Sequence, residues 1–303
     1  MPARLRQALL SPILLLTLTQ LFWAGNWVVG RAVREEVPPI ALTFWRWVIA
    51  LALIAPLAWP HLRRQWPEVR AGRRSLLLLG LLGTGFYNAL AYTGLQQTSA
   101  INGVLLNAFI PLLIIVLAWA GFGRHVRRAE AAGVAVSLLG VLAIIGQGEL
   151  RFLAALRFNA GDLWILASVL TWALYTNLLP RRPASLHPLA FLACIAAVGL
   201  VAMLPFYAWE LAAGRRIVPG AAAWAAIAYT GVFPAFLGYL FWNRGVARVG
   251  PARAAQFLYL MPVFGVLLSM LFLDERPALY HFAGIALIFG GIYLSSTARP
   301  GTA

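Results

Sequence analysis

Long apolar segments separated by short polar stretches run along the whole chain of 303 residues. A helix needs about 20 mostly apolar residues to cross a bilayer, and ten segments approach or meet this requirement. They cover residues 9–30, 39–59, 75–95, 100–120, 130–147, 162–180, 187–208, 220–243, 251–273 and 279–297. The pattern predicts an all-α integral membrane protein with ten transmembrane helices, the first of which is retained because no clear cleavage site follows it.

Glycines and prolines recur along the chain at one constant separation, which indicates an internal repeat. Five predicted helices fall in each copy, and an odd number of crossings turns the second copy upside down. We therefore expect two inverted five-helix repeats, residues 1–148 and 149–303, around a central cavity whose access alternates between the two sides. The pairs that lie 151 residues apart are Gly94 and Gly245, Pro111 and Pro262, Gly133 and Gly284, and Gly140 and Gly291.

Composition supports a membrane protein and indicates its orientation. Hydrophobic residues make up 62% of the chain and charged residues 11%, with a mean hydropathy of +0.81 and a net charge of +15. The arginines lie mostly in short loops, so we expect them to meet lipid headgroups rather than nucleic acid. With a cytoplasmic N-terminus, 16 arginines fall on the cytoplasmic side and 7 on the other. This bias predicts two cytoplasmic termini in a bacterial inner membrane.

Few residues with catalytic or metal-binding chemistry are present. Cys194 is the single cysteine, the four histidines are far apart, and each acidic residue falls in a loop or at the end of a predicted span. No cofactor or metal is expected, and an intramembrane enzyme is disfavoured. A channel remains the other alternative, although the chain has no charged rings. Without a carboxylate in mid-membrane, we expect a carrier driven by the gradient of its solute.

Polar residues in mid-span should face a partner or a water-filled cavity, because burying them in hydrocarbon is costly. Aromatic walls with a few amides would suit a small amphipathic zwitterion or an aromatic cation. Aromatic residues near span ends can instead belong to the membrane-interface belt. The candidate substrate-binding residues are Trp23, Asn26, Trp27, Thr84, Tyr87, Asn88, Asn107, Trp172, Tyr175, Tyr239, Asn243, Gln256 and Tyr259.

Three further residues are candidates for gating. Arg46 lies about seven residues inside the second predicted span. It could snorkel to the surface, bind a substrate carboxylate or lock the two halves together. Pro111 and Pro262 each remove a backbone donor from a predicted helix, so either could form a hinge or a static kink. The repeated glycines are interpreted as sites of close helix packing.

Five segments, taken in their order and spacing, are typical of one known family. They are FWAGNWVVGRAV (22–33), PPIALTFWRWVIALAL (38–53), GVLLNAFIPLL (103–113), GDLWILASVLTWALYTNLLPRR (161–182) and FLYLMPVFGVLLSMLFLDERP (257–277). Together they resemble the drug/metabolite transporter superfamily, in its ten-span type with two EamA-like halves, and the likeness is greatest to bacterial exporters of aromatic and other amino acids. The resemblance implies a secondary transporter that exports small amphipathic metabolites, above all amino acids, by alternating access, for which a monomer suffices; a multidrug exporter of lipophilic cations is the alternative. The acidic loop at Asp274 and Glu275 has no counterpart in the first half.

Overall fold

The computed structural model describes residues 11–98, 106–123, 127–149, 151, 159–272 and 278–296, and every regular element within them is helical. Two shorter apolar helices, Ile110–Gly121 and Leu279–Ser295, accompany six helices that are long and apolar enough to cross a membrane. The all-α prediction is confirmed, whereas the number of ten spans stays a prediction. The acidic loop at 274–275 and both chain ends lie outside the described residues. The six long helices are Pro12–Gly30, Pro39–Arg64, Arg73–Gln97, Ala160–Arg181, Pro188–Ala212 and Ala221–Val249.

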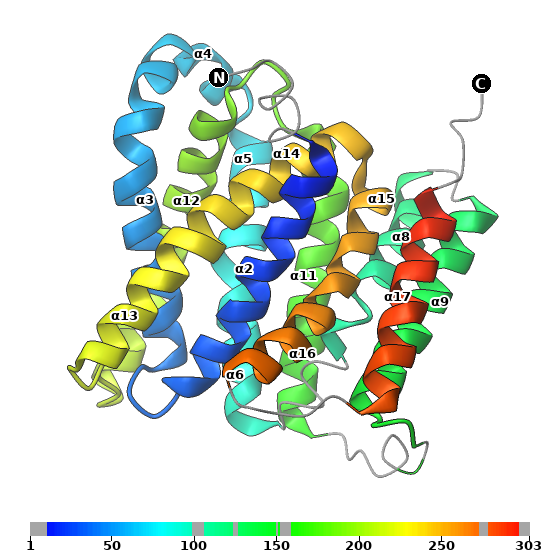
Figure 1. The fold of residues 1–303 in the computed structure, drawn as a ribbon. Coiled ribbons are helices and arrows are strands. Elements are labelled where there is room, and N and C mark those ends of the chain that lie inside the picture. The colour runs from blue at the N-terminus through cyan, green and yellow to red at the C-terminus, as the bar shows by residue number, and fades with distance from the viewer. Residues whose placement is uncertain are drawn as a thin grey trace, which may run out of the picture.

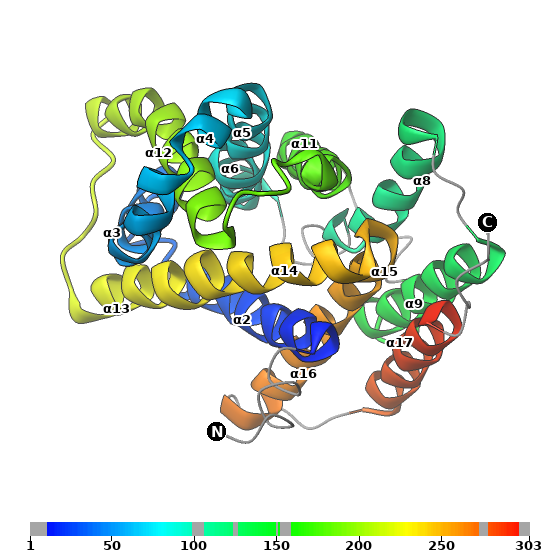
Figure 2. The ribbon, with the colours of Figure 1, turned by 90° about the horizontal axis from the view of Figure 1, so that it is seen from above.

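The helices form a single bundle in which α9 and α17 lie at one side, and α3, α12 and α13 at the opposite side (Figures 1 and 2). The first part of the chain contains α2 (Pro12–Ala32), α3 (Pro39–Arg64), α4 (Trp66–Ala71), α5 (Arg73–Leu79), the π-helix η1 (Gly80–Phe86), α6 (Tyr87–Gln97), α8 (Ile110–Phe122) and α9 (Arg128–Ile145). The second part contains α11 (Ala160–Leu178), the 3₁₀-helix η2 (Leu179–Arg181), α12 (Pro188–Ala212), α13 (Ala221–Thr230), the π-helix η3 (Gly231–Gly238), α14 (Tyr239–Val249), α15 (Pro251–Gln256), the 3₁₀-helix η4 (Phe257–Tyr259), α16 (Leu260–Phe272) and α17 (Leu279–Ser296).

Helix boundaries follow local chemistry. Proline occupies the first helical position of both α3 and α12, where its missing N–H would have no helical partner. Asn159 caps α11 by accepting hydrogen bonds from the backbone N–H groups of Gly161 and Asp162, while the Asp162 side chain accepts from the Asn159 N–H. The α8 helix ends at Gly123, whose φ of 60° is a conformation that glycine adopts without strain.

Element boundaries recur along the chain at the separation seen in the sequence. The π-helix η1 begins at Gly80 and η3 begins at Gly231, 151 residues later. The α9 and α17 helices begin and end at positions that are also 151 residues apart. Glycine at the start of both π-helices, and glycines along both terminal helices, mark these places in the sequence. The start of the π-helices and the bounds of α9 and α17 therefore recur at the spacing of the glycine and proline pairs.

The α9 and α17 helices pack antiparallel through small residues. A Cβ atom on Gly133 would lie 2.5 Å from the carbonyl oxygen of Gly291, and one on Gly140 would lie 2.5 Å from that of Gly284. Between these contacts, the Ser137 hydroxyl donates to the carbonyl oxygen of Ile288 at 3.2 Å. The contacts are reciprocal, as in an interface with a two-fold axis, because each helix offers the same repeat positions to the other. Small side chains let the two backbones approach this closely.

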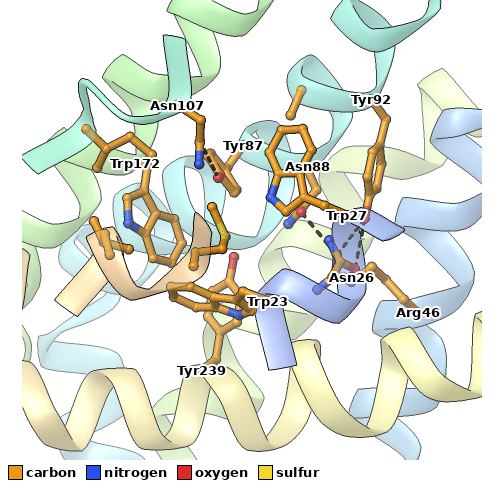
Figure 3. A pocket seen from close by; sticks show the side chains of 14 residues that line it. Trp23, Asn26, Trp27, Arg46, Tyr87, Asn88, Tyr92, Asn107, Trp172 and Tyr239 are labelled. Carbon is orange, nitrogen blue, oxygen red and sulfur yellow. Dashed lines mark hydrogen bonds between the residues drawn. The ribbon is translucent and has the colours of Figure 1, made fainter. Parts of the chain in front are cut away.

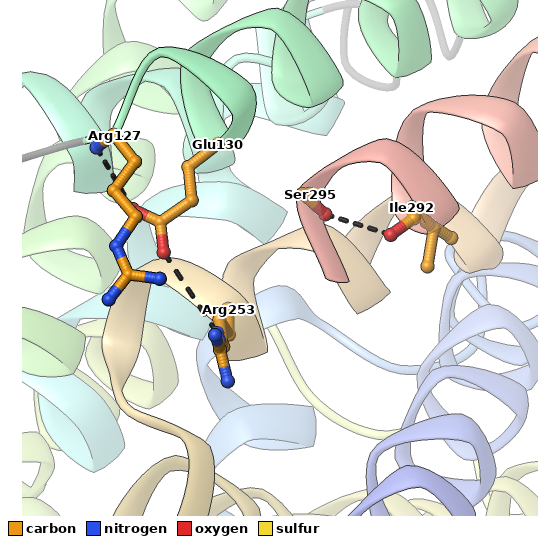
Figure 4. A network of polar contacts seen from close by, with 5 residues as sticks. All are labelled: Arg127, Glu130, Arg253, Ile292 and Ser295. Atoms are coloured by element: carbon orange, nitrogen blue, oxygen red, sulfur yellow. Dashed lines mark hydrogen bonds and ion pairs between the residues drawn. The ribbon is translucent and has the colours of Figure 1, made fainter. Parts of the chain in front are cut away.

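Carboxylates secure two helix ends to neighbouring elements. Glu130 on α9 lies with one oxygen 4.0 Å from Nε of Arg253 on α15, while its other oxygen accepts the backbone N–H of Arg127 (Figure 4). Glu210, near the end of α12, accepts the backbone N–H groups of Ile40 and Ala41 at the start of α3. A carboxylate at a helix N-terminus satisfies donors that have no partner within the helix. Both contacts join elements that are far apart in the sequence.

Adjacent glycines on α17 provide a test of the packing between α9 and α17. Gly291 faces Ser137 and Gly133, whereas a Cβ atom on Gly290 would meet nothing within 4 Å. Gly291→Leu should lower the free energy of unfolding by about 1–3 kcal/mol through overpacking, and Gly290→Leu should leave it nearly unchanged. Thermal unfolding of the detergent-solubilised protein measures both variants. Equal destabilisation by the two substitutions would contradict this packing.

Candidate functional site

An enclosed cavity lies in the middle of the bundle, where side chains from seven helical elements converge (Figure 3). The first part of the chain contributes α2, α3, α6 and α8, and the second part contributes α11, α14 and the η4–α16 segment. The cavity volume is about 20 Å³, which is close to the space that one water molecule needs, about 10–15 Å³. The lining residues are Trp23, Asn26, Trp27, Arg46, Tyr87, Asn88, Ala91, Tyr92, Asn107, Ile110, Trp172, Tyr239, Leu258 and Met261.

Several of these side chains follow directly after a break in the regular α-helix, and the break sets the direction in which they point. Tyr87 and Asn88 follow directly after η1, and Tyr239 follows directly after η3. A π-helix has more residues in each turn than an α-helix, so it rotates the side chains that come after it. The Tyr239 hydroxyl donates to the carbonyl oxygen of Gly83 within η1, and the Trp23 indole donates to that of Pro234 within η3 at 3.1 Å. Side chains near the cavity thus satisfy carbonyl groups of the interrupted helices.

Arg46 organises the polar side of the cavity. Its Nη1 atom donates to Oδ1 of Asn26 at 3.2 Å, to Oδ1 of Asn88 at 3.1 Å and to the Tyr92 hydroxyl at 3.1 Å. The Tyr92 hydroxyl donates in turn to Oδ1 of Asn26 at 3.0 Å. The Arg46 side chain is 1% exposed, so it points into the bundle and does not snorkel to the surface. Three helices, α2, α3 and α6, are joined by this network.

Aromatic rings form the opposite wall. The Trp172 ring centroid lies 5.0 Å from that of Trp23, 4.8 Å from that of Tyr87 and 5.5 Å from that of Tyr239. The Trp23 and Trp172 rings meet edge to face, which is the favoured geometry for an aromatic pair. The Tyr87 hydroxyl also donates to Oδ1 of Asn107 at 3.1 Å. The cavity therefore has one wall of aromatic rings and one side of amides and a guanidinium group.

The structure brings most of the predicted residues to this cavity and places five of them elsewhere. The Thr84 hydroxyl donates to carbonyl oxygens in η1 and α12. Tyr175 and Asn243 hydrogen-bond to each other, and Gln256 is buried with no hydrogen-bond partner among the described residues. Tyr259 lines a small neighbouring cavity of about 10 Å³. The predicted residues that do line the central cavity are Trp23, Asn26, Trp27, Arg46, Tyr87, Asn88, Asn107, Trp172 and Tyr239.

The two candidate hinge prolines lie together beside the central cavity. Pro111 and Pro262 both line the small cavity that contains Tyr259, and Asn107 and Leu258 line both cavities. Turn residues precede α8, and the 3₁₀-helix η4 precedes α16, so the chain departs from α-helix just before each proline. The two helix interruptions therefore face each other next to the site.

Tyr92 also belongs to the site, although it is not among the candidate residues predicted from the sequence. It lies one helical turn after Asn88 on α6, so the two residues share a face. It also lies 151 residues before Asn243, a residue that was selected. Either the helical spacing or the repeat could have identified it. Leu258, Met261 and Ile110 are ordinary apolar residues, and nothing in the sequence distinguished them from packing residues.

A second cavity of about 430 Å³ lies near the end of α11 and is lined by Leu179, Arg182 and Val246, among others. Burial lowers the pKa of the Arg182 guanidinium below its usual range. The α14 helix has residues on both cavities, and η2, which continues α11, provides Leu179 to the second one. The Tyr175 hydroxyl donates to Oδ1 of Asn243 at 2.6 Å, with both side chains buried. This hydrogen bond joins α11 to α14 about one turn beyond Trp172 and Tyr239, which line the central cavity.

Comparison with known families assigns this architecture. The model of the EamA-like transporter family matches residues 10–146 and again residues 159–297. The chain belongs to the EamA-like transporter family. This confirms the resemblance to the drug/metabolite transporter superfamily seen in the sequence, and it identifies a membrane transporter rather than an enzyme.

Relatives of this transporter match over most of its length. An uncharacterized transporter of Bacillus subtilis, YyaM, is 29% identical over 85% of this chain and 84% of its own. A probable terminal-alkyne amino-acid exporter of Streptantibioticus cattleyicolor is 27% identical over 92% of this chain and 91% of its own. A solved crystal structure superposes with a TM-score of 0.75 at 22% identity, covering 94% of this chain and 96% of that one. The last likeness shows a shared fold.

The Arg46 network of this transporter can be tested with two tyrosines. Tyr92→Phe removes a hydroxyl that bonds both Arg46 and Asn26, so it should lower the free energy of unfolding by about 1–3 kcal/mol. Tyr229→Phe is the control, because the Tyr229 hydroxyl reaches only the Phe22 carbonyl at 3.4 Å. We expect that variant to unfold within about 0.5 kcal/mol of the wild type. A Tyr92→Phe protein as stable as the control would show that the network adds nothing to the fold.

Proposed function

We propose that this protein is a secondary transporter that exports small amphipathic metabolites, above all aromatic and other neutral amino acids, by alternating access. The observation that carries the proposal is the central cavity, which both parts of the chain enclose and which combines aromatic rings with amides and one cation. Apolar walls provide contact area and a few polar groups set the orientation of a bound solute. The substrate-binding residues proposed from the sequence are retained, with those that line the cavity in direct contact.

We further propose that residues 1–148 and 149–303 form two inverted five-helix repeats. Support comes from α9 and α17, which hold equivalent positions in the two copies and pack antiparallel through reciprocal glycine contacts. Equivalent helices that run in opposite directions are what an inverted repeat requires. The recurrence of the π-helices at the same separation also supports this arrangement.

The closed state of the cavity suits an occluded step of alternating access. A volume of about 20 Å³ cannot hold an amino acid, so helices must separate before a solute binds. We propose that Pro111 and Pro262 act as hinges, since each lies at a helix interruption beside the site. We propose that the Tyr175–Asn243 hydrogen bond is a gate between the central cavity and the second cavity at Arg182.

Orientation and driving force follow from charge. The proposed location is the bacterial inner membrane with both termini cytoplasmic, a placement that the arginine bias of the loops supports. The cavity lining contains no carboxylate, and Glu210 is engaged at the start of α3. A proton relay through acidic residues therefore has no place at this cavity. We propose that the gradient of the solute drives its export.

Amino acids lead the proposed substrates for two reasons. One relative carries the name of a probable terminal-alkyne amino-acid exporter, and this chain surrounds its cavity with aromatic rings that suit an apolar side chain. The same rings would also suit lipophilic cations, which attract the faces of aromatic rings. Transport measurements with both classes of solute decide between them.

Counterflow in proteoliposomes tests the transport mechanism. Vesicles loaded with unlabelled L-phenylalanine should transiently accumulate labelled L-phenylalanine from outside, because a carrier exchanges solute across the membrane. The overshoot should persist when the pH is equal on both sides. An open channel would give simple equilibration, and strict dependence on an imposed pH gradient would contradict a gradient-driven uniporter.

A pair of tryptophan variants tests the site. Trp27 lines the cavity, whereas Trp164 on α11 is 44% exposed on the outside of the bundle. Trp27→Ala removes apolar contact area worth about 1–3 kcal/mol, so half-maximal counterflow should need roughly tenfold more L-phenylalanine or above. Trp164→Ala should behave as the wild type. If both variants transport normally, the cavity is not the substrate site.

A further inference from the structure

Arg46 is a buried cation without a carboxylate partner among the described residues. The ion pairs found there are Arg34–Glu35, Arg151–Glu149 and Arg253–Glu130. The partners of Arg46 are two amide oxygens and a hydroxyl group, all of which are neutral. Its side chain is 1% exposed and sits in a long apolar helix. A positive charge in such surroundings is costly unless a negative charge compensates it.

The central cavity also has buried donors that lack an acceptor among the described residues. Arg46 donates to the amide oxygen of Asn88, so the group of that amide left for a ligand is its Nδ2 donor, which lies near the Tyr239 hydroxyl. Nε of Arg46 and Nε1 of Trp172 are buried and have no hydrogen-bond partner within the part of the chain that the structure describes. All three residues line the central cavity. Buried donors without acceptors are unfavourable, so an acceptor that enters the cavity would be stabilised there.

A carboxylate group would supply both the missing negative charge and the missing hydrogen-bond acceptors. It carries the missing negative charge, and its two oxygens accept several hydrogen bonds without donating any. A guanidinium group matches its planar geometry better than any other side chain does. The cavity lining offers no equivalent group for an ammonium ion, since it contains no acidic residue. The central cavity therefore recognises a solute whose charged end is a carboxylate rather than an ammonium group.

We infer that the central cavity selects solutes by a carboxylate held at Arg46 and Asn88, with the apolar or aromatic body of the solute against Trp23, Trp27 and Trp172, and that an α-amino group is not required. This inference rests on the proposed transport function and defines its substrate class. Small aromatic and apolar carboxylic acids are expected substrates, and amino acids are one subset of them. Lipophilic amines are excluded.

Three solutes with the same phenyl ring test the inference on the wild-type protein in proteoliposomes. L-phenylalanine carries both charged groups, 3-phenylpropionate only the carboxylate, and phenethylamine only the ammonium. As competitors of labelled L-phenylalanine counterflow, 3-phenylpropionate should act within about tenfold of unlabelled L-phenylalanine, and phenethylamine should be weaker by about 100-fold, as expected for two charge-assisted hydrogen bonds. Phenethylamine that competes as well as 3-phenylpropionate would overturn the inference while transport itself stands.

Binding to the purified protein separates this inference from the transport proposal. The same three solutes are titrated in detergent, with intrinsic tryptophan fluorescence as the readout, because three tryptophans line the cavity. If counterflow is absent but 3-phenylpropionate still binds and phenethylamine does not, the transport proposal fails and the carboxylate site stands. If no carboxylate binds, the inference fails.

Two aspartate substitutions examine the charge deficit directly. Asn88→Asp places a carboxylate on a residue whose side-chain oxygen lies 3.1 Å from Nη1 of Arg46. It should raise the midpoint of thermal unfolding and weaken 3-phenylpropionate binding at least tenfold, because the protein then supplies its own anion. Asn107→Asp adds the same group to the same cavity beside Tyr87, outside the Arg46 network, and should lower the midpoint. A lower midpoint for Asn88→Asp, or unchanged binding in that variant, would contradict the inference.

Discussion

Inside a membrane every backbone N–H and C=O group must find its hydrogen-bond partner within the protein, because lipid offers none. A continuous α-helix meets this requirement by itself but presents only side chains to a neighbour. A polar site therefore forms most readily where helices are interrupted and other groups satisfy the freed carbonyls. In this protein the π-helices η1 and η3 and the breaks before α8 and α16 are such places. The central cavity lies among all four.

The same requirement explains why aromatic residues with polar atoms surround the cavity. The indole of Trp23 and the hydroxyl of Tyr239 each donate to a carbonyl oxygen of an interrupted helix, while their rings pack against Trp172. One side chain thus satisfies the backbone and also builds the apolar wall. The Arg46 network does the equivalent on the polar side, with the difference that Arg46 has no carboxylate partner, and its Nε no hydrogen-bond partner, among the described residues.

Two kinds of contact join neighbouring helices in the bundle. Glycines bring α9 and α17 together backbone to backbone, so these helices can move only as a unit without losing close packing. Between α11 and α14 the connection is made by large side chains and one hydrogen bond, from Tyr175 to Asn243. Side chains can change rotamer while the helices stay intact. The contact between α11 and α14 therefore depends on side-chain conformation, whereas that between α9 and α17 depends on close approach of the backbones.

Apolar patterning was enough to predict the helical membrane fold, and polar and aromatic residues within the apolar runs identified most of the residues that line the cavity. These features are local, since hydrophobicity and backbone conformation act over one helix or one turn. Local sequence features did not determine whether the Arg46 side chain lies at the surface or in the interior. Its position in the second apolar run allowed the surface as well as the interior, and only the approach of Asn26, Asn88 and Tyr92 from two other helices settled it.

The π-helices also change side-chain directions in a way that an α-helical reading of the sequence does not predict. Thr84 shares a sequence face with Tyr87 and Asn88 when an α-helical period is assumed, yet η1 turns its hydroxyl toward carbonyl groups in η1 and α12. The apolar runs can be recognised in the sequence because each depends on residues close together along the chain, and the repeat can be recognised because the same residue types recur at one fixed spacing. Which side chains share a cavity, and which charge in it lacks a partner, depended on helices that meet only after folding. Tertiary structure alone decided these, because the pairing of buried polar groups is a property of their three-dimensional neighbours.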